Sequence, residues 1–193
     1  MQGLDGSVHP GDAEAGRRIV AELTARGFDV AAGNKVRDHG PHQGFGHAVA
    51  FVLVRLLKSA GIPCVPVLLN TYYPPNQPSP RRCVDLGTAL AGAVRALPGG
   101  RRAVVIASGG LSHFVVDTEL DALLLEGMRS GDLDALAALP ASRMNSGTSE
   151  GRNWLVAAGA GGAERLKHQW SEYVPAYRSP AGTGTGLAFG LWA

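Results

Sequence analysis

Apolar and polar positions alternate along this chain in stretches that predict helices separated by short strands. Residues 13–26 carry apolar side chains three and four positions apart, so they predict an amphipathic helix that Asp12 caps and Gly27 ends. Residues 47–61, HAVAFVLVRLLKSAG, are apolar on nearly every side and predict a buried helix. Further helices are expected over 83–97, 117–129, 132–138 and 146–160.

Runs rich in β-branched residues predict the strands. Short strands are expected over 28–32 and 63–70, and the tail 168–192 predicts one or two strands joined by a glycine-rich turn. Residues 102–108, RAVVIAS, form a nearly continuous apolar run, which is typical of a central strand covered on both faces. Because strands alternate with helices, we expect an α/β fold in one domain, with a mixed, largely parallel sheet flanked by helices.

Composition and charge exclude several classes of protein. The chain has 193 residues and a formal net charge of +2, and its basic residues are scattered, so no nucleic-acid partner is expected. The longest apolar run is too short to cross a bilayer, which argues against a membrane protein. The first residues lack the basic and then apolar pattern of a signal peptide, so we expect a cytoplasmic protein.

The segment GGLSH, residues 109–113, directly follows the expected central strand. Ligands in open α/β sheets bind at the carboxyl ends of strands, and two glycines allow a substrate or another backbone to approach closely. His113 can transfer protons near neutral pH. The alternative is a turn histidine that caps the following helix.

The segment SGTSE, residues 146–150, opens an expected helix. Ser146 or Thr148 can cap that helix, and a carboxylate at Glu150 is favoured in its first turn by the helix dipole. Glu150 is therefore either a capping residue or a fixed carboxylate ligand for a divalent metal.

Histidines crowd the segment RDHGPHQGFGH, residues 37–47. His39, His42 and His47 could hold the metal of a hydrolase with a further ligand from elsewhere, although a solvated histidine-rich loop is the commoner case. The glycines of GTGTG, residues 182–186, lack the strand and helix context of a phosphate loop and predict a flexible turn.

Five segments together resemble the class III extradiol ring-cleavage dioxygenases, the superfamily of the protocatechuate 4,5-dioxygenase β subunit. They match in order and approximate spacing, from about residue 9 to the end of the chain. The segments are DHG (38–40), PPNQPSPRRCVDLG (74–87), IASGGLSHF (106–114), SGTSEGRNW (146–154) and YVPAYRSPAGTGTG (173–186).

The resemblance implies a catalytic domain over 1–193 that cleaves a catecholic acid of the protocatechuate, gallate or methylgallate type with O2. Its cofactor would be Fe(II), held by two histidines and a glutamate, and Glu150 corresponds to that glutamate. By resemblance His113 is the acid/base histidine and His39 a second catalytic histidine. The residues expected to line the substrate pocket are Gly110, Ser112, His42 and Thr148.

The two histidine ligands of this family lie in an N-terminal segment that this chain lacks. The chain is therefore expected to be an N-terminally truncated form of the fold, incomplete for iron binding by itself. It would work as a homo-oligomer, or as a hetero-oligomer with a chain that supplies the missing segment. The alternative is a non-catalytic partner or binding subunit that retains the dioxygenase fold.

Overall fold

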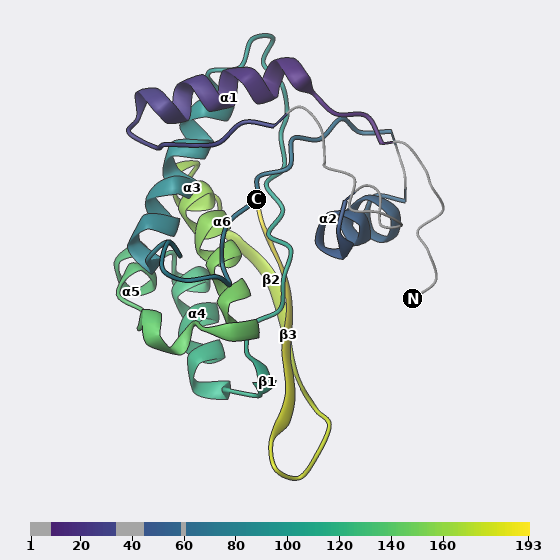
Figure 1. Cartoon of the computed structure of the whole chain (residues 1–193), viewed down its shortest axis with the longest axis vertical. Helices are drawn as coiled ribbons and strands as arrows, with labels where there is room; N and C mark the ends of the chain where they lie inside the picture. The colour runs from purple at the N-terminus through teal and green to yellow at the C-terminus, as the bar shows by residue number, and fades with distance from the viewer. Residues whose placement is uncertain (1–8, 34–44, 59–60) are drawn as a thin grey trace. The chain divides into compact units, whose positions relative to one another are not determined.

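The computed structural model describes residues 9–33, 45–58 and 61–193 (Figure 1). These residues belong to two compact units, Met1–Leu68 and Leu69–Ala193. The predicted catalytic histidine His39 and the predicted pocket residue His42 lie outside the described residues.

The first unit contains the helix α1, Ala13–Ala25, which confirms the expected amphipathic helix. The Asp12 carboxylate accepts a hydrogen bond from the Ala15 amide at 2.9 Å and caps the helix. Gly27 follows its end with φ +80°, a conformation that glycine adopts without strain. The predicted strand over 28–32 does not form in this unit.

The expected buried helix over 47–61 is much shorter in the structure. A helix α2, His47–Phe51, continues into a single π-helical turn, Val52–Leu56. Phe51 and Leu56 are both 60% exposed, so the expectation of burial on every side is wrong. An unbroken apolar run has no helical period, and therefore it fixes neither the length of the helix nor the face that is buried.

The second unit holds four helices of the described chain: α3 (Pro80–Arg95), α4 (Thr118–Ser130), α5 (Leu133–Ala137) and α6 (Gly151–Ala163). A 3-10 turn, η3, spans Ser146–Glu150 and leads directly into α6. The positions of these elements agree with the expected helices to within a few residues. Side-chain oxygens cap three of them at the start, since Ser79, Asp117 and Asp132 precede α3, α4 and α5.

Two glycines let α3 and α6 approach each other closely (Figure 1). A Cβ atom added at Gly87 on α3 would lie 2.0 Å from the carbonyl oxygen of Val156. A Cβ atom added at Gly159 on α6 would lie 2.1 Å from the carbonyl oxygen of Val84. Backbone packs directly on backbone at this crossing, where no side chain can be accommodated.

Substitution of Gly87 by alanine is therefore expected to separate the two helices. Overpacking at a backbone contact predicts a loss of about 1–3 kcal/mol or more in the free energy of unfolding. The control is Gly161→Ala on α6, where an added Cβ atom meets nothing within 4 Å. Urea unfolding should show that the control is as stable as the wild type or about 0.5–1 kcal/mol more stable. Equal stability of both variants would contradict the close crossing.

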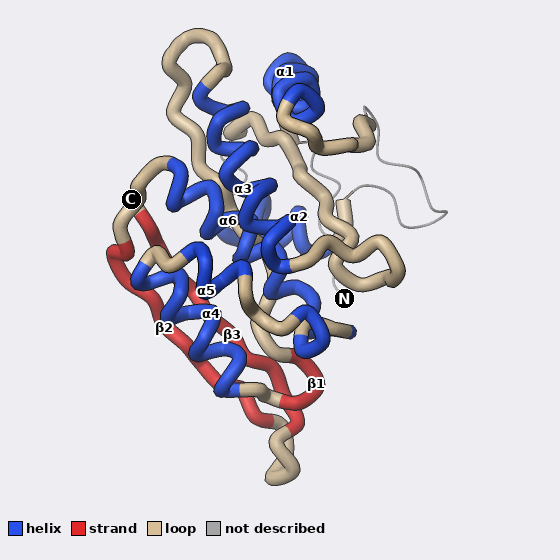
Figure 2. The backbone as a smooth tube through the Cα atoms, turned by 90° about the vertical axis from the view of Figure 1, so that its left-hand side faces the viewer, coloured by secondary structure: helices blue, strands red, loops and turns tan. Residues whose placement is uncertain are grey.

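The sheet of the second unit has three strands in the order β1-β3-β2, and all of its pairings are antiparallel (Figure 2). The strands are β1 (His113–Val115), β2 (His168–Tyr177) and β3 (Thr183–Trp192). The mixed helix and sheet content is confirmed, but the expected largely parallel sheet is not found among the described residues. β2 and β3 follow each other along the chain through a short turn, and such a connection permits only antiparallel pairing.

The expected strands over 63–70 and 102–108 are also absent from the described structure. Cys64 makes one isolated parallel bridge with Gly11, and Val104 is 83% exposed. A strand needs a neighbour for its backbone hydrogen bonds, and an apolar run does not specify that neighbour. The prediction of a flexible turn over GTGTG is also wrong for most of this segment. Residues 183–186 belong to β3, and the turn precedes them.

Candidate active site at His113 and Glu150

The loop that leads into His113 requires glycine at two successive positions. Gly109 has φ +150°, and a Cβ atom there would lie 3.0 Å from the Glu150 side chain. A Cβ atom at Gly110 would lie 2.7 Å from Cε1 of the His113 ring. The two glycines of GGLSH thus make room for the two side chains that carry the candidate chemistry.

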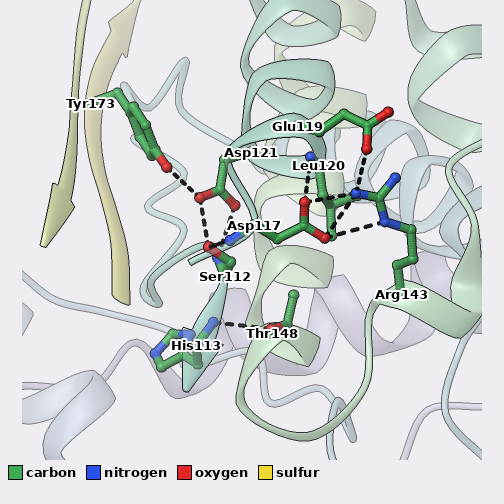
Figure 3. Close-up of polar contacts among 9 residues, drawn as sticks. All are labelled: Ser112, His113, Asp117, Glu119, Leu120, Asp121, Arg143, Thr148 and Tyr173. Carbon is green, nitrogen blue, oxygen red and sulfur yellow. Dashed lines mark hydrogen bonds and ion pairs between the residues drawn. The ribbon is translucent and has the colours of Figure 1, made fainter. Parts of the chain in front are cut away.

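Hydrogen bonds fix the orientation of the His113 ring. Its Nδ1 atom lies 2.9 Å from the carbonyl oxygen of Leu111. Because a carbonyl only accepts, Nδ1 carries the proton, and the lone pair of the neutral ring is on Nε2. The backbone N–H of His113 donates to the Thr148 hydroxyl at 3.0 Å, so that η3 also holds this residue (Figure 3).

Glu150 directs its carboxylate toward the glycine loop. It is the residue before α6, yet its side chain caps no amide of that helix. One oxygen, Oε2, instead accepts a hydrogen bond from the Gly110 N–H at 2.9 Å. The same oxygen lies 3.7 Å from Nε2 of His113. The structure therefore contradicts the interpretation of Glu150 as a helix-capping residue.

Both side chains remain partly accessible, since His113 is 24% and Glu150 36% exposed. Neither side chain is therefore sealed inside the core. His113 is not the cap of the following helix either, because Asp117 accepts the hydrogen bond from the Leu120 amide there. The pair combines a base with a fixed anion, which suits proton transfer next to a bound cation or a polar substrate.

Helix α6 holds the other end of the glycine loop. The side-chain amide of Asn153 donates to the carbonyl of Ser108, and the indole N–H of Trp154 donates to the carbonyl of Gly109, both at 2.9 Å. Arg152, which is buried, donates to the carbonyls of Pro78 and Met144. Since Met144 lies just before η3, Arg152 ties the segment that carries Glu150 to the proline-rich loop.

Two residues near the candidate site have strained backbone. Phe114, which follows His113, has φ +68°, and Ser146 at the start of η3 has φ +53°. Residues other than glycine rarely adopt this conformation, and such strain is concentrated at functional sites.

A buried carboxylate that the sequence analysis missed lies behind the loop. Asp121 on α4 is 1% exposed and accepts hydrogen bonds from the Ser112 N–H at 2.9 Å, the Ser112 hydroxyl at 2.7 Å and the Tyr173 hydroxyl at 2.7 Å (Figure 3). Burial and this hydrogen bond raise the pKa of Tyr173 above its ordinary value. The signal was present in the sequence, because an acidic residue at 121 shares the helical face of Leu124, Leu125 and Met128.

An ion pair stabilises the start of α4 near the site. Partial burial raises the pKa of the Asp117 carboxyl, but hydrogen bonds from Arg143 and from the Leu120 amide outweigh it, so the pKa lies below its ordinary value. A lowered pKa in the folded state means that the stabilisation is present above the unfolded pKa and is lost as the pH falls.

Asp117→Asn keeps an oxygen for the helix cap and removes the charge that pairs with Arg143. Urea unfolding at pH 7 is expected to show a loss of up to about 1 kcal/mol. The difference between the wild type and the variant should shrink as the pH falls below about 4, where the wild-type carboxyl takes up its proton. A difference that is constant between pH 7 and pH 3 would contradict this assignment.

The structure brings four of the predicted site residues together: His113, Glu150, Gly110 and Thr148. Ser112, predicted to line the pocket, is fully buried, and its hydroxyl is engaged by Asp121 and by the Asp117 amide. Within the described ranges no group of three or more His, Cys, Asp or Glu side chains is placed to hold a metal ion. Glu150 and His113 are two suitable donors, so the described residues do not make a complete iron site.

Comparison with protein families finds a match that covers most of this chain. The family of the catalytic LigB subunit of aromatic ring-opening dioxygenase matches residues 7–188, which is nearly the whole chain and includes both candidate residues. The chain belongs to this family. Membership implies an aromatic ring-opening dioxygenase, which agrees with the resemblance found in the sequence.

Comparison with curated proteins found no match. Among the helices that the structure describes, none has both the length and the apolar character needed to cross a membrane.

Proposed function

We propose that this chain opens the ring of a catecholic aromatic acid, of the protocatechuate, gallate or methylgallate type, by extradiol cleavage with O2. The observation that carries the proposal is the position of His113 Nε2, 3.7 Å from Glu150 Oε2, in a member of a ring-opening dioxygenase family. The two segments that hold these atoms, GGLSH and SGTSE, are also the most specific part of the sequence resemblance.

His113 acts as the base that takes a proton from a catechol hydroxyl. Its Nδ1–H is held by the Leu111 carbonyl, so Nε2 alone is available to accept a proton. The Glu150 carboxylate attracts the positive charge that the ring then acquires. The same histidine returns the proton in a later step that requires an acid.

Glu150 is the proposed carboxylate ligand of Fe(II), and the Gly110 N–H holds that carboxylate in place. When bound, Fe(II) supplies the Lewis acid and the redox centre that bring a catechol and O2 together. The two further histidine ligands that the resemblance implies would be supplied by another chain of a hetero-oligomer. His39 is proposed as a second catalytic histidine and His42 as a pocket residue.

Oxygen uptake by the full chain in its native assembly, supplied with Fe(II) under anaerobic conditions and then exposed to O2, tests this function. Protocatechuate, gallate and methylgallate are the substrates, and a monohydroxybenzoate, which lacks the neighbouring hydroxyl, is the control. Uptake with at least one catechol and none with the control is expected. Catechol binding without oxygen uptake would instead support a non-catalytic binding subunit.

A further inference from the structure

The peptide group between Leu111 and Ser112 is held from both sides. Its N–H, on Ser112, donates to Oδ1 of Asp121 at 2.9 Å, and its carbonyl, on Leu111, accepts from Nδ1 of His113 at 2.9 Å. A trans peptide is a rigid planar unit, so a bond that fixes the N–H also fixes the direction of the carbonyl. Asp121 thereby acts on the His113 ring without touching it.

Asp121 is itself held firmly in position. Its second oxygen accepts hydrogen bonds from the hydroxyls of Ser112 and Tyr173, which come from the loop and from β2 (Figure 3). The Ser112 hydroxyl in turn accepts the Asp117 N–H at 2.9 Å. A buried carboxylate is costly unless it is fully hydrogen-bonded, and here three donors satisfy it.

We infer that Asp121 is a positioning residue, which sets the Leu111–Ser112 peptide so that His113 keeps its proton on Nδ1 and presents the lone pair of Nε2 toward Glu150. The geometric part of this inference stands by itself. Its consequence for turnover rests on the proposed function, in which His113 is the base.

Gly186 closes the network and gives the GTGTG segment a role. Its backbone pairs with the loop, since its carbonyl accepts from the Leu111 N–H at 2.9 Å and its N–H donates to the Ser112 carbonyl at 2.8 Å. A Cβ atom at Gly186 would lie 2.0 Å from Oδ2 of Asp121 and 2.9 Å from the Ser112 hydroxyl oxygen. Its φ lies outside the region that favours glycine, so alanine is unfavourable there because of this contact alone.

The test measures the tautomer of His113 in the full chain, before iron is added, by long-range nitrogen–proton NMR correlation. At a pH where the ring is neutral, the wild type is expected to show a single tautomer with the proton on Nδ1. Gly186→Ala and Asp121→Ala displace or remove the carboxylate, and both tautomers should then appear. Asp121→Asn can still accept the Ser112 N–H through its amide oxygen and should largely restore the single form. Gly161→Ala, in open space on α6, is the control that leaves the tautomer unchanged.

A wild-type ring with its proton on Nε2 would overturn the inference, and so would a folded Gly186→Ala or Asp121→Ala variant that keeps the single Nδ1–H form. If both variants fail to fold, hydrogen exchange of the wild-type Ser112 amide tests whether Asp121 holds this N–H. Protection comparable to that of the core of α4 supports the inference, and rapid exchange overturns it.

Kinetics separate this inference from the proposed function. Gly186→Ala is expected to lower kcat about 10- to 100-fold, the usual effect of losing a residue that orients a functional group, with little change in KM. A wild type without ring-opening activity would refute the proposed function and leave the tautomer result standing. Loss of activity with an unchanged tautomer would refute the positioning role alone.

Discussion

Glu150→Gln is expected to lower the rate of ring opening by about a thousandfold and to leave the fold intact. Glutamine retains an oxygen that can accept the Gly110 N–H, so the glycine loop keeps its contact. The variant loses the negative charge that is proposed to hold Fe(II). A metal contributes several kcal/mol to a reaction of this kind, and about 1.4 kcal/mol corresponds to a tenfold change in rate.

The matched control for this prediction is Glu119→Gln, which makes the same chemical change on α4. The Glu119 side chain is 78% exposed and pairs with Arg143 away from the glycine loop. The ring-opening activity of the Glu119→Gln variant should equal that of the wild type. Oxygen uptake and iron content measured on both variants test this prediction. Wild-type turnover by Glu150→Gln would show that Glu150 does not belong to the proposed site.

His113→Asn is expected to lower kcat about 10²- to 10⁴-fold, the contribution usual for a general acid or base. An asparagine amide can still donate to the Leu111 carbonyl in place of Nδ1–H, so the loop is preserved and only the base at Nε2 is lost. KM for the catechol should change little, because the variant removes a proton acceptor rather than a binding surface.

His168→Asn is the control for this variant. His168 begins the long hairpin, where its ring packs against Trp192 and contacts the Ser171 hydroxyl, whereas His113 pairs with Thr185 near the other end of β3. Steady-state kinetics with a catecholic acid should separate the two variants. Equal losses of kcat would indicate a general structural effect rather than a base at His113.

Elements with a local pattern could be predicted from the sequence. α1, α3 and α4 have an apolar face at helical spacing, and each begins with a capping Asp or Ser. The tail hairpin was also predictable, since its two strands are joined by a short turn. The arrangement of the sheet could not be predicted. The composition of residues 102–108 is typical of a strand, but it does not specify a neighbouring strand to pair with.

The candidate site could be predicted only where a residue with suitable chemistry lies next to a local structural signal, such as a glycine pair or a helix start. Two glycines before His113, and a glutamate at the start of a helix, indicated the pair that the structure brings together. The apolar helix face around Asp121 indicated that its carboxylate is buried, but the spacing did not indicate its partners, since Tyr173 is 52 residues away along the chain. Such a network depends on tertiary packing, which the spacing of residues in a single sequence does not reveal.

Oxygen stoichiometry tests the central claim most directly. The full chain in its native assembly, loaded with Fe(II), is given a limiting amount of the best catecholic acid, while O2 consumption and loss of the aromatic absorbance are followed together. A ring-opening dioxygenase that uses His113 and Glu150 predicts one O2 consumed for each ring opened, with both signals about a thousandfold slower in Glu150→Gln. Consumption of O2 with the ring intact, or ring opening at the wild-type rate in Glu150→Gln, would contradict the account.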